Sequence, residues 1–262
     1  MLTTAAAYRM IARDLPRSLA NTAKQPQIAR ESEYYLANIG KIKSIDDFMS
    51  DTRIYQYAVK AMGLQDMAYA KAFIRKALTE GIDDKNSFAN RLVDGRFREL
   101  VATFNFARNG ETTTDSPATR QGIVDKFVRM SLEENAGQQN EGVRLALYFA
   151  RKAPSIVSPM QLLADPALVK VVQTALSLPP QMSLQDIDRQ AKVISDRLNV
   201  KDFSDPKKLQ SFLTRFTSLW ELQNPSSSAA TAPSILIGNQ QTSLGLSSSV
   251  LTALQNLRLG GR

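Results

Sequence analysis

The sequence of 262 residues contains no cysteine and no histidine. Without cysteine the chain has no disulfide, no thiolate nucleophile and no cysteine-held zinc or iron–sulfur cluster. Without histidine it lacks the commonest general base and every imidazole ligand for a metal. Only carboxylate, lysine or tyrosine chemistry, or an oxygen-only site for magnesium or calcium, remains. We therefore predict a protein with no enzymatic activity, no catalytic residues, no cofactor and no metal.

Long apolar segments are also missing. The longest notable run, Leu145 to Ala150, is far shorter than the roughly 20 residues that a membrane-spanning helix requires. The first residues contain no uninterrupted apolar stretch followed by a small-residue cleavage site. The sequence predicts neither a membrane span nor a cleavable signal peptide.

The net charge of +8 is concentrated at the two ends of the chain. Residues 1–30 hold five basic residues against one acidic residue, and residues 225–262 hold two arginines and no acid. The remaining charge of +2 is spread over nearly 200 residues. A nucleic-acid-binding protein usually gathers its basic charge on a folded face, so this distribution favours other partners.

Helix signals occur along most of the chain. Ser44 and Ser183 each begin a stretch that resembles a capping box, with aspartate three residues later. Ser158, Asp165 and Asp205 each precede a proline, an arrangement typical of a helix start. Apolar residues between these starts recur every three or four positions, for example at Leu209, Phe212, Phe216 and Trp220. We predict an all-α fold.

An internal repeat relates two parts of the sequence. Residues 48–54 align with residues 162–168 at an offset of 114, and the alignment continues without a gap to Leu64 and Leu178. After a small insertion, Phe73, Ile74 and Leu78 match Val193, Ile194 and Leu198, and then Phe88 and Leu92 match Leu209 and Leu213. The shared positions are apolar residues or helix caps, so the repeat is one of packing. We predict two divergent copies of a multi-helix unit.

These patterns divide the chain into five segments. We predict an amphipathic N-terminal helical segment at 1–43, a first repeat at 44–107, and a second repeat at 158–224. Between the repeats, 108–157 would hold a loop followed by two helices. Residues 225–262 contain no lysine and no acidic residue, and they read as a Ser/Ala/Gln-rich low-complexity tail ending in a short amphipathic helix.

Both ends of the chain carry amphipathic segments that are candidates for partner binding. Near the N-terminus, a basic stripe at Arg9, Arg13 and Arg17 faces an apolar side, and near the C-terminus an apolar stripe precedes two glycines. We expect both ends to be removable without loss of the fold. The predicted partner-binding residues are Tyr8, Arg9, Ile11, Arg13, Leu15, Val250, Leu251, Leu254 and Leu257.

Several strings of the sequence resemble a bacterial family known as domain of unknown function 1217. The resemblance covers about residues 1–224 and is carried by residues 25–31, Tyr34-Tyr35, Asn38-Ile39, 46–48, 57–61, 71–76, 142–149, Ala153-Pro154 and 164–168. It implies an association with flagellar gene clusters, beside genes for motor, basal-body and rod proteins. It implies no catalytic residue, because the family has no established active site.

Two functions follow as hypotheses. The first is a non-enzymatic flagellar protein that acts in flagellum assembly or structure through contacts made by its helices. The expected partners are rod, hook, basal-body or export components, and self-association is also expected. Its expected location is cytoplasmic or flagellum-associated, with export through the flagellar apparatus as one route. The alternative is a cytoplasmic nucleic-acid-binding or regulatory protein that uses the basic excess. Neither hypothesis involves a small-molecule substrate.

Overall fold

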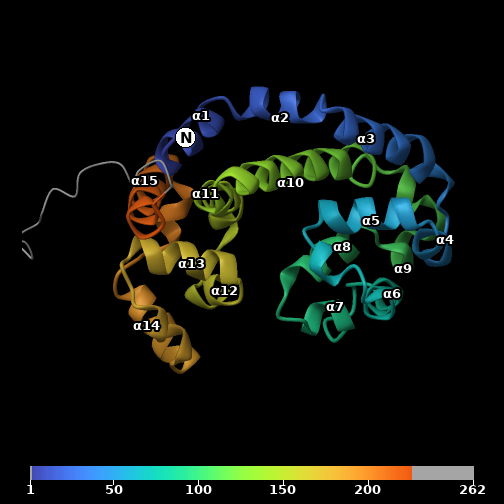
Figure 1. Ribbon diagram of the computed structural model, residues 1–262. Helices are drawn as coiled ribbons and strands as arrows, with labels where there is room; N and C mark the ends of the chain where they lie inside the picture. The colour runs from blue at the N-terminus through green and yellow to red at the C-terminus, as the bar shows by residue number, and fades with distance from the viewer. Residues whose placement is uncertain (1, 226–262) are drawn as a thin grey trace, which may run out of the picture. The chain divides into compact units, whose positions relative to one another are not determined.

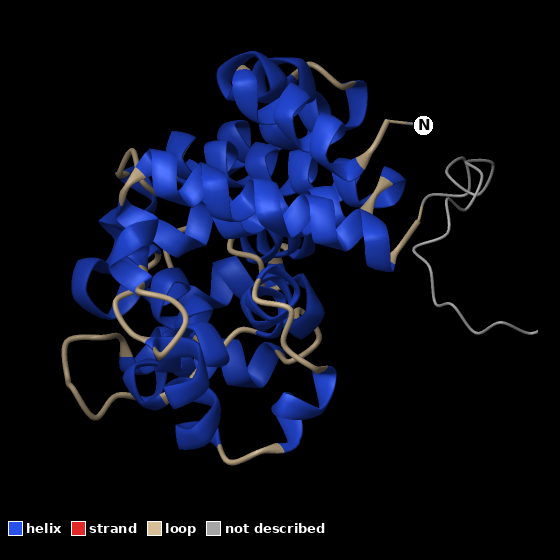
Figure 2. Ribbon diagram, turned by 90° about the vertical axis from the view of Figure 1, so that its left-hand side faces the viewer, coloured by secondary structure: helices blue, strands red, loops and turns tan. Residues whose placement is uncertain are grey.

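Helices form all the regular secondary structure of the residues that the structure describes, 2–225 (Figure 1, Figure 2). The structure is a computed structural model, and these residues belong to one compact unit, Met1–Ser226. The all-α prediction is therefore confirmed for this part of the chain. The predicted tail, with Val250, Leu251, Leu254 and Leu257, lies outside the described residues.

The first group of helices, in chain order, is α1 Thr4–Arg13, α2 Leu15–Ala23, α3 Pro26–Asn38, η1 Ile39–Lys41, α4 Ile45–Ser50, α5 Thr52–Ala61, η2 Gln65–Met67, α6 Lys71–Glu80, α7 Phe88–Arg91, α8 Gly95–Thr103, α9 Phe106–Asn109 and η3 Gly110–Asp115, where η marks 3₁₀ helices. The second group is α10 Gln121–Gln139, α11 Glu141–Lys152, η4 Ala153–Ser155, α12 Pro159–Leu163, α13 Pro166–Ala175, η5 Pro180–Leu184, α14 Ile187–Ser195, η6 Val200–Ser204 and α15 Pro206–Gln223.

Side-chain caps fix most of the helix starts that the sequence predicts. The Ser44 hydroxyl accepts the Asp47 backbone N–H, and the Asp165 and Asp205 carboxylates each accept two backbone N–H groups of the following turn. These bonds satisfy amides that have no partner inside the helix. One predicted cap is wrong: Asp186, not Ser183, caps α14, because Ser183 lies within η5.

Local features recur at the 114-residue offset that the sequence indicates. η1 and η4 begin at Ile39 and Ala153, and α5 and α13 have the same length and bounds related by this offset. The pairing does not extend as far as the sequence alignment does, because Phe88 begins the four-residue α7 whereas Leu209 and Leu213 lie within the 18-residue α15. The common helix bounds therefore cover only the stretch around α5 and α13, and a full multi-helix repeat stays a prediction.

The ends of α5 and α13 share a left-handed residue. Gly63 has φ +72° and Ser177, 114 residues later, has φ +52°. In both places the next residue donates its N–H to a carbonyl five residues back: Leu64 to Val59 at 2.9 Å and Leu178 to Gln173 at 2.8 Å. This hydrogen bond is that of a Schellman helix end, whose left-handed position favours glycine.

Glycine at position 177 is expected to stabilise the protein. Ser177 carries a Cβ in a backbone conformation that costs a non-glycine residue energy, and its side chain is exposed. We predict that Ser177→Gly raises the free energy of unfolding by about 0.5–1 kcal/mol, measured by chemical denaturation. Gly63→Ala makes the reverse change at the equivalent position, and it should lower the free energy of unfolding by a similar amount. The interpretation is wrong if both substitutions change stability in the same direction.

The helices enclose two hydrophobic cores. The first core extends from Ile28 to Val128 and centres on the rings of Tyr35, Phe48, Tyr57 and Phe104. The second core contains residues of α11 to α15, including Phe149, Phe203, Phe212 and Phe216, together with Tyr8 from α1. The long helix α10 packs against α2, α3 and α5 and also against α11, so it belongs to both halves (Figure 1).

The predicted N-terminal segment 1–43 does not form a unit of its own. Helix α1 packs against α11 and α15 of the second core, whereas α3 packs against α5 and α10 of the first core. Thr4 ties α1 to the second core: its backbone N–H and its hydroxyl both donate to the Glu221 carboxylate, at 2.8 and 2.5 Å, and its hydroxyl accepts a bond from Asn140 at 2.9 Å.

The predicted loop between the repeats is an ordered part of the first core. Residues 109–117 contain the end of α9 and the 3₁₀ helix η3, in which Thr113 and Thr114 are buried. The Thr114 hydroxyl donates to the Ile42 carbonyl at 2.8 Å. A polar threonine hydroxyl can be buried when it bonds to a backbone carbonyl, so the polar composition of this segment does not indicate a free loop. The two helices predicted after it are present as α10 and α11.

Candidate functional site

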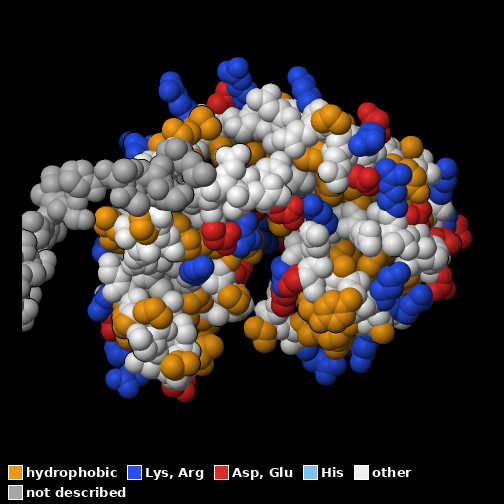
Figure 3. Space-filling model, viewed as in Figure 1, with side chains coloured by type: hydrophobic (Ala, Val, Ile, Leu, Met, Phe, Trp, Pro, Cys, Tyr) orange, Lys and Arg blue, Asp and Glu red, His pale blue; other side chains and the backbone are white. Residues whose placement is uncertain are grey.

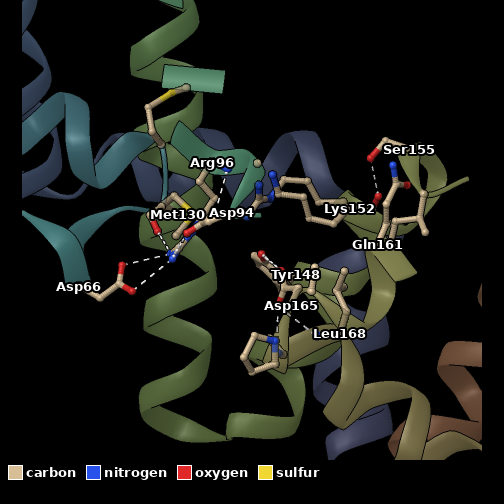
Figure 4. Close-up of a pocket in the computed structure, with 18 of the residues that line it drawn as sticks. Asp66, Asp94, Arg96, Met130, Tyr148, Lys152, Ser155, Gln161, Asp165 and Leu168 are labelled. Atoms are coloured by element: carbon tan, nitrogen blue, oxygen red, sulfur yellow. Dashed lines mark hydrogen bonds and ion pairs between the residues drawn. The ribbon is translucent and has the colours of Figure 1, made fainter. Parts of the chain in front are cut away.

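A cleft of about 790 Å³ is lined by residues of both halves (Figure 3, Figure 4). Its lining comes from the segment leading into α8, from α10 and α11, and from the start of α13. A volume of this size falls within the range of small-molecule sites. Whether the cleft can serve as one depends on how its charged side chains are used.

The wall from the first half is organised by Arg96. Its guanidinium forms ion pairs with Asp94 at 2.7 Å and with Asp66 at 3.1 Å, and it also donates to the Gly63 carbonyl. Burial alone would raise the pKa of the Asp94 carboxyl, but the hydrogen bonds from Arg96 outweigh burial and hold this pKa below its usual value. Both carboxylates are thus already committed to one cation.

The floor of the cleft holds a buried carboxylate. The Glu133 side chain on α10 is 2% exposed, and it accepts hydrogen bonds from Arg129 at 2.8 Å and from Arg151 of α11 at 2.8 and 2.9 Å. Arg129 also donates to the Leu147 carbonyl of α11 at 3.0 Å. One carboxylate therefore joins two cations and holds α10 to α11.

The wall from the second half pairs a tyrosine with a helix cap. The Tyr148 hydroxyl donates to the Asp165 carboxylate at 2.5 Å, while the other oxygen of Asp165 caps α13 (Figure 4). Burial and this bond to an anion both raise the pKa of Tyr148, so the hydroxyl keeps its proton. Tyr148 is not poised to act as a base.

An ion-pair cluster beside the cleft connects the halves. Glu99 of α8 accepts Lys126 of α10 at 2.8 Å and Lys152 of α11 at 3.3 Å. Burial opposes ionisation of Glu99, but the two ammonium groups outweigh it and lower its pKa. A carboxyl with a lowered pKa contributes stability above its unfolded-state pKa and loses it as the pH falls, so acid should loosen this connection.

The cleft charges are therefore largely paired with one another. Among the lining cations, Arg98 alone is exposed and forms no ion pair within residues 2–225. The same part of the chain contains no group of three or more acidic side chains placed to hold a metal ion. The arrangement is that of a joint between two cores, and it leaves few free groups for chemistry on a ligand.

The predicted N-terminal partner residues divide between core and surface. Tyr8 is 3% exposed in the second core, and Ile11 and Leu15 are half-buried, with Ile11 packed against that core. Arg9 and Arg13 are exposed. The prediction of Tyr8 as a partner-binding residue is wrong, because the apolar face of α1 is covered by α11 and α15 of the same chain. Removal of residues 1–20 should consequently damage the fold.

Truncation of Tyr8 should test this role in the core. Burial raises the pKa of its hydroxyl to about 12, with Arg129 opposing the shift slightly. We predict that Tyr8→Ala lowers the free energy of unfolding by about 3 kcal/mol, as other buried aromatic truncations do, while its exposed neighbour Arg9→Ala changes it by less than about 0.5 kcal/mol. Urea titration measures the free energy of unfolding of both variants. Similar losses in the two variants would mean that Tyr8 of α1 does not stabilise the second core.

A row of exposed cations remains on the outer side of α1 to α3. We name it the basic row: Arg9, Arg13, Arg17, Lys24 and Arg30. All five are exposed, and none forms an ion pair with another residue of the described part, where fifteen such pairs occur. Figure 3 shows lysine and arginine side chains projecting along the edge formed by these helices. The sequence predicts the first three members, but their isolation from acids is visible only in the structure.

The described part is thus an all-α protein with two cores, a cleft whose charges pair with one another, and an unpaired basic surface on its first helices. No helix between residues 2 and 225 is long and apolar enough to cross a membrane. The chain belongs to the family described as protein of unknown function (DUF1217), which matches residues 61–209. This confirms the resemblance found in the sequence.

A solved structure shares this fold. The chain is similar to the X-ray crystal structure of protein AGR_C_984 from Agrobacterium tumefaciens, with 52% identity and a TM-score of 0.78. The match covers 85% of this chain and 94% of that chain. No curated protein matches the sequence.

Proposed function

We propose that the protein is a non-enzymatic component of flagellum assembly or structure that acts through helix-mediated contacts with other flagellar proteins. The flagellar setting comes from the association that the family resemblance implies. The observation that supports a contact function is the basic row, a set of exposed cations without acidic partners in the described part of its own chain. Exposed cations that have no internal partner are available to an external one.

The use of charge in the cleft also supports a binding role over a catalytic one. A general base or nucleophile must be free to exchange a proton or attack a substrate. Glu133, Asp94 and Asp165 are instead each held by arginine, tyrosine or backbone donors that a substrate would have to displace. Through these bonds Glu133 joins α10 to α11, and Asp165 joins α11 to α13.

Cell fractionation tests the flagellar role. Antibodies against the purified protein would be used on cytoplasm, purified basal bodies and culture medium, from normal cells and from cells that lack the flagellar export apparatus. We expect the protein in the basal-body fraction of normal cells, or outside the cell in an export-dependent manner. Retention in the cytoplasm of both strains, with no basal-body signal, would contradict the proposal.

A further inference from the structure

The basic row gathers five exposed cations without an ion pair within residues 9–30, whereas many other cations of the described part are paired inside the chain. Arg53, Arg96 and Arg151, for example, each pair with a carboxylate of the same chain. On α1 and α3, Arg9 and Arg30 donate only to backbone carbonyls one turn back in their own helices, at 3.2 and 3.1 Å. Donor capacity remains on each of these guanidinium groups.

Nearby acids do not neutralise the row. The Asp14 carboxylate accepts the Arg17 backbone N–H at 3.1 Å and so caps α2. Glu31 is bound by Arg53 through two hydrogen bonds of 3.0 and 3.1 Å. Glu33, exposed on α3, is the remaining acid of these three helices. The surface of α1 to α3 therefore carries a local positive excess.

The row is held on a rigid support. The inner sides of α1, α2 and α3 pack against α10, α11 and α15, and α1 is fixed at its start by the bonds of Thr4 to Glu221 and Asn140. From Arg9 to Arg30 the helices extend over at most about 30 Å at 1.5 Å per residue. The cations are thus presented at about one per 7 Å, with no ordering of the backbone needed on binding.

We infer that the basic row binds an α-helix of a partner protein that carries acidic residues about one turn apart. Acidic residues at every fourth position of a helix recur about every 6 Å at 1.5 Å per residue, which is close to the average spacing of about 7 Å in the row. Duplex nucleic acid carries one negative charge per about 1.7 Å, so most of its phosphates would stay unneutralised on this surface. The inference rests on the proposed contact function, since it names the partner of the same surface.

The surroundings of the row favour a protein partner over single-stranded nucleic acid or a lipid surface. Base stacking needs exposed aromatic rings, but Tyr8 and Tyr35 are buried and the Tyr34 ring is covered by the Arg53 guanidinium at 3.7 Å. Binding to a membrane surface needs an apolar face that enters the lipid. The apolar faces of α1 and α3 are used by the two cores, and Met10 and Leu36 are the large apolar side chains exposed on these helices.

Fluorescence anisotropy with the full-length protein tests the inference. The probe is a labelled alanine-rich helical peptide of about 20 residues with glutamate at every fourth position, and its control has the same composition with the glutamates gathered at one end. We expect the first peptide to bind more tightly than the second, and its binding to weaken between 50 and 200 mM salt. Equal binding of the two peptides would overturn the inference, because it would show attraction to net charge alone.

Charge reversal locates the site. The variant Arg9→Glu, Arg13→Glu, Arg17→Glu should lose at least about tenfold in affinity, as expected for the loss of several exposed ion pairs. The matched control is Arg189→Glu, Arg197→Glu, Lys201→Glu, which replaces three exposed cations of the second half and so changes the net charge by the same amount. Its affinity for the peptide should stay within about twofold of that of the unchanged protein. Equal losses in the two variants would overturn the inference. If thermal melting shows that the first variant is unfolded, the glutamine versions of both triples replace them.

Two further probes decide the class of partner. A 20-nucleotide single-stranded DNA and vesicles containing phosphatidylserine are measured under the same conditions, and we expect both to bind more weakly than the first peptide at 200 mM salt. Tighter binding of either, lost in the Arg9, Arg13, Arg17 variant, would overturn the inference in favour of a nucleic acid or a lipid surface. If the peptide does not bind but the protein is found in basal bodies, only the inferred acidic helix partner is rejected. If the peptide binds but the protein is not found in basal bodies or outside the cell, only the flagellar role is rejected.

Discussion

Substitution of Gly142 by alanine is expected to lower the free energy of unfolding by about 3 kcal/mol, the upper part of the range for overpacked sites. A Cβ at this position would lie 2.8 Å from the Thr4 methyl group, and closer still to the indole ring of Trp220. Gly142 is buried in the first turn of α11, where α1 and α15 meet. Neither neighbour can move away freely, since Trp220 is packed in the second core and Thr4 is hydrogen-bonded to Glu221.

The control for this substitution is Gly95→Ala. Gly95 begins α8, and a Cβ there would meet no atom within 4 Å. Alanine is the better helix former, so this variant should be neutral or slightly more stable. Denaturant titration of both variants gives the comparison, and a Gly142→Ala protein as stable as Gly95→Ala would show that α1 and α15 do not pack closely on α11.

The second large effect is expected from Glu133→Ala. This change leaves Arg129 and Arg151 partly buried beside each other without the carboxylate that both of them bind. Removing one partner of a buried ion pair costs about 3–5 kcal/mol because the remaining charge is uncompensated. Since Arg151 comes from α11 and Glu133 from α10, the loss should appear as cooperative unfolding at lower denaturant concentration, and Glu133→Gln should show most of it.

The adjacent Glu134 supplies the matched control. Its side chain is 36% exposed and forms one ion pair with Lys60 at 2.6 Å. Exposed pairs contribute about 0–1 kcal/mol, so Glu134→Ala should have a small effect. If the two alanine variants lose similar amounts of stability, the hydrogen bonds from Arg129 and Arg151 to Glu133 do not stabilise the contact between α10 and α11.

The predictability of the fold depended on how local each signal is. The caps Ser44, Asp165 and Asp205 were correct because a capping side chain bonds to the backbone two or three residues ahead of it. The same locality explains the error at Ser183, because either Ser183 or Asp186 could cap a helix, and Ser183 is taken up in η5, so that α14 begins after Asp186. Residues 109–117 were read as a loop from composition, although the Thr113 hydroxyl bonds to the Gly110 carbonyl and the Thr114 hydroxyl bonds to the distant Ile42 carbonyl.

The candidate binding surface illustrates the same limit. The spacing of Arg9, Arg13 and Arg17 in the sequence indicated one exposed side of the N-terminal helices, and these residues are exposed. The sequence assigned the opposite, apolar side to a partner protein, whereas Tyr8 of that side lies in the chain's own second core. An apolar helix face indicates that the face is buried, but it does not indicate whether the covering element belongs to the same chain or to a partner.

The sequence by itself determined that the described part of the chain is helical, where most helices begin, and that thiol and imidazole chemistry are absent. These properties follow from composition and from interactions within a few residues. The tertiary structure decided that α1 joins the second core more than 130 residues away, that Glu133 binds Arg129 and Arg151, and that no cation of the basic row pairs with an acid of the described part. Packing and charge pairing between distant residues depend on the positions of whole helices, which local patterns do not specify.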